Sequence, residues 1–151
     1  MVDHNYERVV VYVDGFNLYF GIRENLPRSY RWLDLNASAK KLLKSNQKLV
    51  DVRYFTARIS RPTQKQQRQE TYLQALATVG GCTLHFGDYR DRSRTCRKCG
   101  NALYIPEEKM TDVKIAVEML ADAYTDQFDT ALLISGDTDI VPPITRADAS
   151  K

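Results

Sequence analysis

The stretch Val9-Val10-Val11-Tyr12-Val13-Asp14-Gly15 indicates the fold class of the chain. Five consecutive apolar residues, four of them valine, are typical of a strand that is buried on both faces, as the inner strands of a parallel sheet are. In open parallel sheets, chemistry gathers beyond the carboxyl ends of the strands. The stretch therefore predicts a central parallel strand over residues 9–13, with Asp14 at its functional end.

Strand and helix patterns alternate along the rest of the chain. Predicted strands cover residues 49–59, 82–86 and 130–134, and predicted helices cover residues 35–45, 64–79 and 111–124. The last helix carries two adjoining apolar stripes that we expect to be buried: Val113, Val117, Leu120 and Tyr124, and beside them Ile115, Ala116, Met119 and Ala123. The alternation predicts an α/β fold, a three-layer α/β/α sandwich with a mostly parallel central sheet, formed as one domain over residues 1–151.

The composition of the 151 residues fits a chain that buries a core, since 43% are hydrophobic and 27% are charged. No apolar run approaches the roughly 20 residues of a membrane helix, and the first residues lack the apolar stretch of a secretory signal. We therefore expect a cytoplasmic protein without membrane contact. The net charge of +3 hides an asymmetry, because residues 1–106 carry +9 and residues 107–151 carry −6.

Carboxylates follow two of the predicted strands. Asp14 ends the first strand, and Asp137 and Asp139 follow the last one, while Asp112 lies in the first turn of the preceding helix. Each of them alone has a structural explanation as a helix cap or a turn residue. Three or four carboxylates in one pocket would repel one another unless a divalent cation lay among them, which predicts Mg²⁺ or Mn²⁺.

Three motifs of the chain resemble those of the NYN domain, a family of PIN-like ribonucleases, and of its LabA-like branch. The first is Val11-Tyr12-Val13-Asp14-Gly15-Phe16-Asn17-Leu18. The second is Glu-Lys-Met-Thr-Asp-Val-Lys-Ile-Ala at 108–116, and the third is Leu-Leu-Ile-Ser-Gly-Asp-Thr-Asp-Ile-Val-Pro at 132–142. They occur in the order of the family and span residues 9–142. The resemblance implies a PIN-like (Rossmann-like) fold.

The resemblance also implies a chemistry. Members characterised as enzymes cleave RNA, and their aspartates hold one or two Mg²⁺ or Mn²⁺ ions. Carried over to this chain, the resemblance assigns metal ligation, directly or through water, to Asp14, Asp112, Asp137 and Asp139. It makes Asn17 a catalytic residue beside them and Ser135 a supporting one. A metal there would activate a water for in-line attack on a phosphodiester, so the chain is expected to be a divalent-metal-dependent endoribonuclease.

Alternatives to this function stay open. One is a catalytically inactive or partner-dependent module that binds RNA or regulates it with the same fold. The complete aspartate set favours catalysis, because a pure binder has no use for an acidic pocket that repels phosphate. A haloacid-dehalogenase-type phosphatase is a rival with a similar Gly-Asp motif, but Phe16 and Val141 occupy positions where that class needs acids.

Two clusters of basic residues are candidates for holding RNA, since phosphate binding requires cations near the acidic pocket. One cluster joins the second predicted strand to the following helix and consists of Arg58, Arg61, Lys65 and Arg68. The other lies within residues 87–106, which we expect to be a basic insertion or an exposed loop, and consists of Arg90, Arg92, Arg94, Arg97 and Lys98. Single-stranded RNA is the expected partner, and ordinary solvated charge is the alternative.

The three cysteines are an odd number, which argues against a disulfide framework. Cys96 and Cys99 have the spacing of half a zinc knuckle, and a structural zinc site needs four ligands. Cys82 and His85 are the nearest other candidates, although a regular strand points them to opposite faces. We expect zinc either within one chain or shared across a homodimer, with a reduced or redox-active pair and a flexible loop as alternatives.

The carboxyl end of the chain departs from the family pattern. Members usually continue beyond the helix that starts near Asp139 into a further strand and helix, whereas this sequence ends at Lys151. The sequence therefore predicts a C-terminally truncated domain, with part of its sheet edge and apolar face uncovered.

Overall fold

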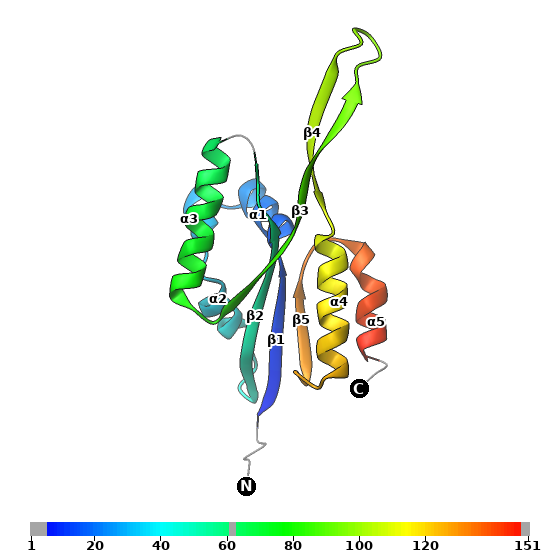
Figure 1. The fold of residues 1–151 in the computed structure, drawn as a ribbon. Helices are drawn as coiled ribbons and strands as arrows, with labels where there is room; N and C mark the ends of the chain where they lie inside the picture. The colour runs from blue at the N-terminus through cyan, green and yellow to red at the C-terminus, as the bar shows by residue number, and fades with distance from the viewer. Residues whose placement is uncertain (1–5, 61–62, 149–151) are drawn as a thin grey trace.

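A central sheet with helices on both faces forms the body of the protein in the computed structural model, which describes residues 6–60 and 63–148, with backbone alone at 89–91 and 105–109 (Figure 1). The strands are β1 (Glu7–Asp14), β2 (Gln47–Ala57), β3 (Cys82–Thr95), β4 (Ala102–Lys109) and β5 (Thr130–Ile134). The helices are α1 (Gly15–Asn25), α2 (Leu35–Leu42), α3 (Thr63–Val79), α4 (Thr111–Tyr124) and α5 (Val141–Asp148), with 3₁₀ turns η1 (Arg28–Trp32) and η2 (Thr138–Ile140).

The strand order is β4-β3-β2-β1-β5, and all neighbours except β3 and β4 are parallel. This confirms the predicted mostly parallel sheet. Strand β1 lies at the centre of the parallel part and pairs with β2 up to Asp14↔Phe55 and with β5 up to Val13↔Ile134. Because β1 and β5 end at the same edge, the segments that follow them begin side by side.

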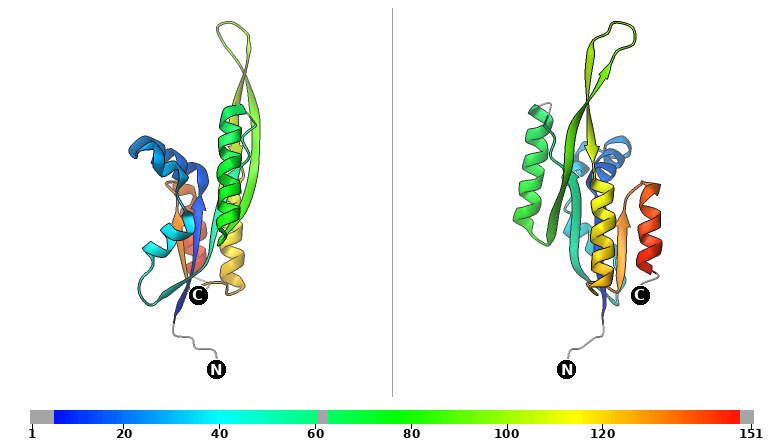
Figure 2. Two further views of the ribbon diagram at one scale, coloured as in Figure 1. Left: turned by 90° about the vertical axis from the view of Figure 1, so that its left-hand side faces the viewer. Right: turned by 45° about the vertical axis from the view of Figure 1, so that its right-hand side comes forward.

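The side chains of β1 divide the core into two layers. Val9, Val11 and Val13 pack with α2 and α3, and Val10 and Tyr12 pack with α4 and α5. The two pairs of helices lie on opposite faces of the sheet (Figure 2). All five of these β1 residues are at most 1% exposed, as the continuous apolar run predicts. Among the helices of the described residues, none is both long enough and apolar enough to span a membrane.

One helix was not predicted, and the buried face of another is narrower than predicted. Residues 15–25, to which the sequence patterns assign no element, form helix α1, which begins because the side chain of Asp14 caps it. In α4 the buried positions include Ile115, Met119 and Ala123, whereas Val113 and Val117 are more than half exposed. Residues four apart share a helix face, and the face that meets the sheet is the second of the two predicted stripes.

Residues 87–106 form an ordered hairpin rather than a loop. Strand β3 leaves the sheet after Gly87, the last residue paired with β2, and continues as an antiparallel ladder with β4 from Asp88↔Lys109 to Thr95↔Ala102. The hairpin projects beyond the carboxyl edge of the parallel strands (Figure 1). Its return strand leads directly into α4, so the start of α4 also lies at that edge.

Candidate functional site

Asp14 is the most deeply buried carboxylate of the carboxyl edge, with 2% of its surface exposed. The backbone N–H of Asn17 donates to its Oδ1 at 3.1 Å, and the side-chain amide of Asn17 donates to its Oδ2 at 2.6 Å. The hydroxyl of Ser135, which follows β5, donates to the same Oδ2 at 3.2 Å. The structure therefore brings together three of the predicted site residues from two separate strands.

Gly15 allows α1 to begin close against the sheet. A Cβ at this position would lie 2.5 Å from the ring of Tyr54 and 2.7 Å from the carbonyl oxygen of Phe55. Such distances are far inside van der Waals contact, so any larger residue would push α1 away from β2. The close approach fixes the direction in which α1 carries Asn17 back toward Asp14.

Asp137 and Asp139 lie on the turn that follows β5. The backbone N–H of Asp137 donates to the Ser135 hydroxyl at 3.1 Å, and the backbone N–H of Asp139 donates to Oδ1 of Asp137 at 2.9 Å. Asp137 therefore caps η2, the structural role that its sequence context also allowed. Ser135 bonds to both Asp14 and the Asp137 backbone, and so it ties this turn to the end of β1.

Asp112 reaches the same edge from the first turn of α4. Met110 precedes that helix with a φ of 69°, in the left-handed region, which makes the tight turn between β4 and α4. Partial burial raises the pKa of the Asp112 carboxyl, and the negative charges of Asp137, Asp14 and Asp139 raise it further. The structure thus brings Asp112 near enough to the other three predicted carboxylates for their charges to act on it.

The donor chemistry of this acidic edge, meaning Asp14, Asp112, Asp137 and Asp139, fits a hard divalent cation. Across residues 6–60 and 63–148, none of the ion pairs involves these aspartates. Within the same ranges, no three His, Cys, Asp or Glu side chains converge as a ready-made metal cage. Mg²⁺ commonly keeps several waters and takes only one or two carboxylates, so the edge suits a cation held partly through water.

The first predicted basic cluster is split by the structure. Arg58 pairs with Glu70 at 2.6 Å and lies over the ring of Phe86, so it serves the packing of α3 on the sheet. Lys65 and Arg68 are exposed on α3 and line a pocket. Arg61 lies outside the described residues.

The second basic cluster is carried by the hairpin. Arg92 and Arg94 lie on β3, and Arg97 and Lys98 lie at the tip between the two strands. The side chain of Arg90 lies outside the described part of the chain. Since the hairpin rises from the carboxyl edge, these cations belong to the same side of the molecule as the four aspartates.

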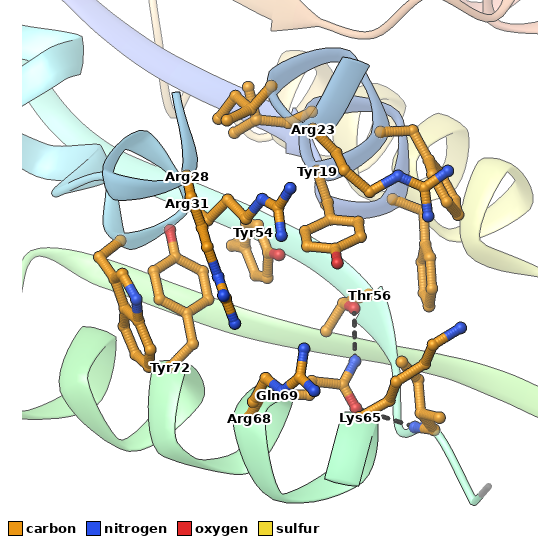
Figure 3. A pocket seen from close by; sticks show the side chains of 17 residues that line it. Tyr19, Arg23, Arg28, Arg31, Tyr54, Thr56, Lys65, Arg68, Gln69 and Tyr72 are labelled. Carbon is orange, nitrogen blue, oxygen red and sulfur yellow. Dashed lines mark hydrogen bonds between the residues drawn. The ribbon is translucent and has the colours of Figure 1, made fainter. Parts of the chain in front are cut away.

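A pocket beside the acidic edge contains residues that the sequence patterns did not single out. It lies between α1, η1, the end of β2 and α3, and has a volume of about 300 Å³ (Figure 3). The residues missed are two aromatics and three arginines: Tyr19, Trp32, Arg23, Arg28 and Arg31. The signal in the sequence is the density of arginine and aromatic residues over residues 19–32.

The four candidate zinc ligands do not form one site within a chain. Cys82 and His85 lie near the start of β3, and Cys96 lies beyond its end, after about ten further strand residues that span roughly 30 Å. Cys82 packs with the core layer of α2 and α3, while His85 stacks on Phe55 in the other layer. The expected single-chain site is therefore wrong, and zinc at the cysteine pair stays a prediction that needs ligands from another molecule.

Cys96 and Cys99 lie in a tight turn at the hairpin tip. The N–H of Gly100 donates to the carbonyl of Cys96 at 2.9 Å, and Gly100 adopts a left-handed φ of 72°. Backbone N–H groups of Cys99 and Lys98, together with the Cys99 thiol, lower the pKa of the Cys96 thiol. The turn thus favours a thiolate at Cys96, with both cysteines accessible to solvent.

Fold and site together define the class of the protein as a PIN-like α/β fold with carboxylates at the carboxyl edge of its parallel strands. The chain belongs to the NYN domain family, whose model matches residues 8–151. Membership confirms the resemblance seen in the three motifs and places the chain in a family of PIN-like nucleases. The assignment to the LabA-like branch stays a prediction.

Two individual proteins illustrate how far the similarity extends. The chain is 26% identical over 171 residues to 6-hydroxy-3-succinoylpyridine 3-monooxygenase HspA of Pseudomonas putida, a match that covers 91% of this chain. That match covers 54% of the relative, so the chain spans about half its length. The crystal structure of a protein of unknown function from Vibrio parahaemolyticus matches 99% of this chain and 78% of its own, with a TM-score of 0.60 and 21% identity. The latter supports the fold alone.

Proposed function

We propose that the protein is a divalent-metal-dependent endoribonuclease that hydrolyses RNA phosphodiester bonds at the acidic edge. One observation carries the proposal: four aspartates from β1, α4 and the turn after β5 share one edge, and three of them raise the pKa of the fourth. No ion pair within the described ranges neutralises them. Membership in a family of PIN-like nucleases supports the same reaction class.

The side chains have separate roles in the proposed reaction. Asp14, Asp112, Asp137 and Asp139 would hold Mg²⁺ or Mn²⁺, partly through water. When bound, such a cation supplies the Lewis acidity that activates water and stabilises the leaving oxygen. Asn17 holds Asp14 through two hydrogen bonds, and Ser135 links Asp14 to the turn of Asp137, so both fix the carboxylates before substrate arrives.

The substrate must be drawn toward a negative edge, and the surrounding cations provide that attraction. Lys65 and Arg68 on one side and Arg92 on the hairpin are suited to contact phosphates near the cleaved bond. Arg94 and Arg97, farther along the hairpin, are suited to contact more distant phosphates of a longer RNA. Such contacts carry little sequence information and weaken as salt increases. We therefore expect cleavage of single-stranded RNA with modest sequence preference and a steep salt dependence.

Cleavage of labelled single-stranded RNA in Mg²⁺ or Mn²⁺ tests the proposal. We expect product that EDTA abolishes, and a loss of at least about 100-fold in Asp14→Asn and Asp137→Asn. Asparagine still caps a helix, so both variants should keep their fold. Asp34→Asn is the matched control, because Asp34 caps α2 in the same way. The neighbouring Asn36 bonds to the carbonyl of Gly81 just before β3, so this cap lies at the amino end of that strand and away from the acidic edge.

Two results would overturn the proposal. Retained cleavage in either Asp14→Asn or Asp137→Asn would remove the acidic edge from the reaction. RNA binding without cleavage in any divalent metal would instead favour the alternative, a module that binds or regulates RNA with the same fold.

A further inference from the structure

The pocket between α1, η1 and α3 adjoins the acidic edge. Gly15 and Phe16, which directly follow Asp14, form part of its wall, and Tyr54 and Thr56 near the end of β2 form its floor. Its volume of about 300 Å³ is at the small end of pockets that enclose organic ligands. The two residues that follow Asp14 line the pocket, so a ligand in it would lie beside the carboxyl end of β1.

Five cations and no acid line the described pocket. Arg23, Arg28 and Arg31 come from α1 and η1, while Lys65 and Arg68 come from α3, and Figure 3 shows the two sets reaching toward each other. Like charges gathered in one cavity repel, so the arrangement favours an anion between them. The Nε of Arg31 is buried with no hydrogen-bond partner in the described structure, so this guanidinium is not fully satisfied by the folded chain.

Aromatic rings provide the remaining walls. Tyr72 packs edge-on against Trp32 at 6.1 Å and against Tyr54 at 6.2 Å, and its hydroxyl donates to the carbonyl of Leu33 at 2.9 Å. These contacts hold Tyr72 in one wall of the pocket. Tyr19 is 39% exposed and Trp32 is 54% exposed, so both rings that line the pocket are accessible to a ligand. Exposed rings beside arginines are the platforms on which unpaired bases stack.

We propose that this pocket binds one unpaired nucleotide of the RNA substrate, with its base against Tyr19 and Trp32 and its phosphate among Arg28, Arg31 and Arg68. The inference deepens the proposed function and rests on it for the identity of the substrate. The inference goes beyond the proposed function because it makes the pocket a determinant of the class of RNA that binds. A base must leave its stack to enter, so single-stranded or looped RNA binds and a continuous duplex does not.

The single tryptophan of the chain makes the proposal directly measurable. Because Trp32 is the only tryptophan and lines the pocket, quenching of its fluorescence reports occupancy there. The probe is adenosine 5′-monophosphate, titrated in EDTA so that no cleavage occurs. We expect saturable quenching, and binding of unphosphorylated adenosine at least about tenfold weaker, because the arginines hold the phosphate.

Substitutions in the pocket test the contribution of the aromatic ring and that of the positive charges separately. Tyr19→Ala removes an exposed ring and should weaken nucleotide binding about tenfold, the usual cost of a lost base stack. Arg28→Gln and Arg68→Gln change exposed cations and should weaken it by a similar factor. Lys48→Gln changes an exposed cation at the opposite, amino end of β2; it is the matched control and should leave binding unchanged. Circular dichroism of each variant verifies the fold.

Specific results would overturn the nucleotide pocket. One is a nucleotide affinity in Tyr19→Ala and Arg28→Gln that equals the wild-type affinity. Another is tighter binding of an aromatic carboxylate such as benzoate, seen as displacement of bound nucleotide at a lower concentration than unlabelled nucleotide requires. Equal binding of duplex and single-stranded RNA, with identical quenching, would also overturn it.

The pocket and the ribonuclease can fail separately. Asp137→Asn should still bind the nucleotide while it loses cleavage. Nucleotide binding without cleavage in the wild type would refute the ribonuclease and keep the nucleotide site, whereas cleavage that ignores Tyr19→Ala and Arg28→Gln would refute the site and keep the ribonuclease.

Discussion

Helix α4 carries carboxylates at both ends, and the chain neutralises only one set. Near its end, Asp122 is 5% exposed and pairs with Arg53 at 2.7 Å, while Glu118 pairs with the same guanidinium at 3.3 Å. The hydroxyl of Tyr12 adds a bond of 2.5 Å to Asp122. At its start, Asp112 meets three more aspartates with no such partner among the described residues.

The difference separates a structural carboxylate from a functional one. A buried acid that has its own arginine needs nothing from outside and stabilises one arrangement of helix and sheet. An acid surrounded by other acids leaves the folded chain with a charge that an external cation or a proton relieves. The aspartates of the acidic edge are therefore better indicators of function than the more deeply paired Asp122.

Removal of the internal cation should have the largest effect on stability. Arg53→Met leaves Asp122 buried and unpaired, which we expect to cost ~3 kcal/mol and to lower Tm by roughly 10 °C. Arg58→Met is the matched control, since its pair with Glu70 is exposed and should be worth less than about 1 kcal/mol. Thermal unfolding measures both, and equal losses would contradict the comparison.

Addition of the external cation should stabilise the opposite end of α4. Mg²⁺ or Mn²⁺ at 100 times its dissociation constant should add about 2.7 kcal/mol, because the folded chain alone assembles the site. Asp137→Asn should lose most of that gain, whereas Arg58→Met should keep it. Calorimetry at constant ionic strength, with KCl replacing the divalent salt, excludes a general salt effect.

Neutralisation of Asp112 should mimic part of the metal effect. The pKa of Asp112 is raised in the folded chain, so the folded state loses stability as pH rises from the ordinary value of 3.8 through the raised one. Asp112→Asn removes that loss and should raise Tm in EDTA at pH 7.5 by roughly 3 °C or less. The corresponding gain in the free energy of unfolding is less than about 1 kcal/mol, because solvent screens the exposed side chain. The gain should vanish at a pH where aspartate is protonated in both states. Asp122→Asn should lower Tm instead.

The smallest effect concerns His85, which lies beside the Arg53 network. Burial lowers the pKa of His85 from its ordinary 6.5, against the opposing influence of Glu118, and its Nε2 is buried without a partner in the described structure. The unfolded chain therefore binds this proton more readily, and stability should fall as pH drops below 6.5. In His85→Gln, the slope of Tm between pH 7 and pH 5 should be shallower than in the wild type.

The sequence predicts those parts of the fold whose residues repeat a burial pattern. The run over residues 9–13 is apolar at every position because both faces of β1 are covered, so its location could be predicted without a structure. The hairpin gives no such signal, because its Arg92 and Arg94 alternate with polar residues, and the side chains that the structure describes at 92–95 and 102–104 are exposed. Helix α1 escaped prediction because its start depends on the Asp14 cap rather than on strong helix formers.

The acidic edge was predictable because strand ends are visible in sequence, and parallel strands bring their ends to one edge. The pocket was not predictable in the same way. Its two walls come from residues 19–32 and 65–72, and only the packing of α1 and η1 opposite α3 brings these segments together. Lys65 and Arg68 were recognised as basic, but the aromatic rings that face them were not.

The three hydrogen bonds to Asp14 limit how it can ligate a cation. A carboxylate has about four lone-pair positions, and the backbone of Asn17, the amide of Asn17 and the hydroxyl of Ser135 occupy three of them. One position remains, so Asp14 can act as a monodentate ligand but not as a chelating one unless a hydrogen bond breaks. Ser135→Ala would release a second position, and the coordination number at Asp14 is therefore controlled by a hydroxyl on the neighbouring strand end.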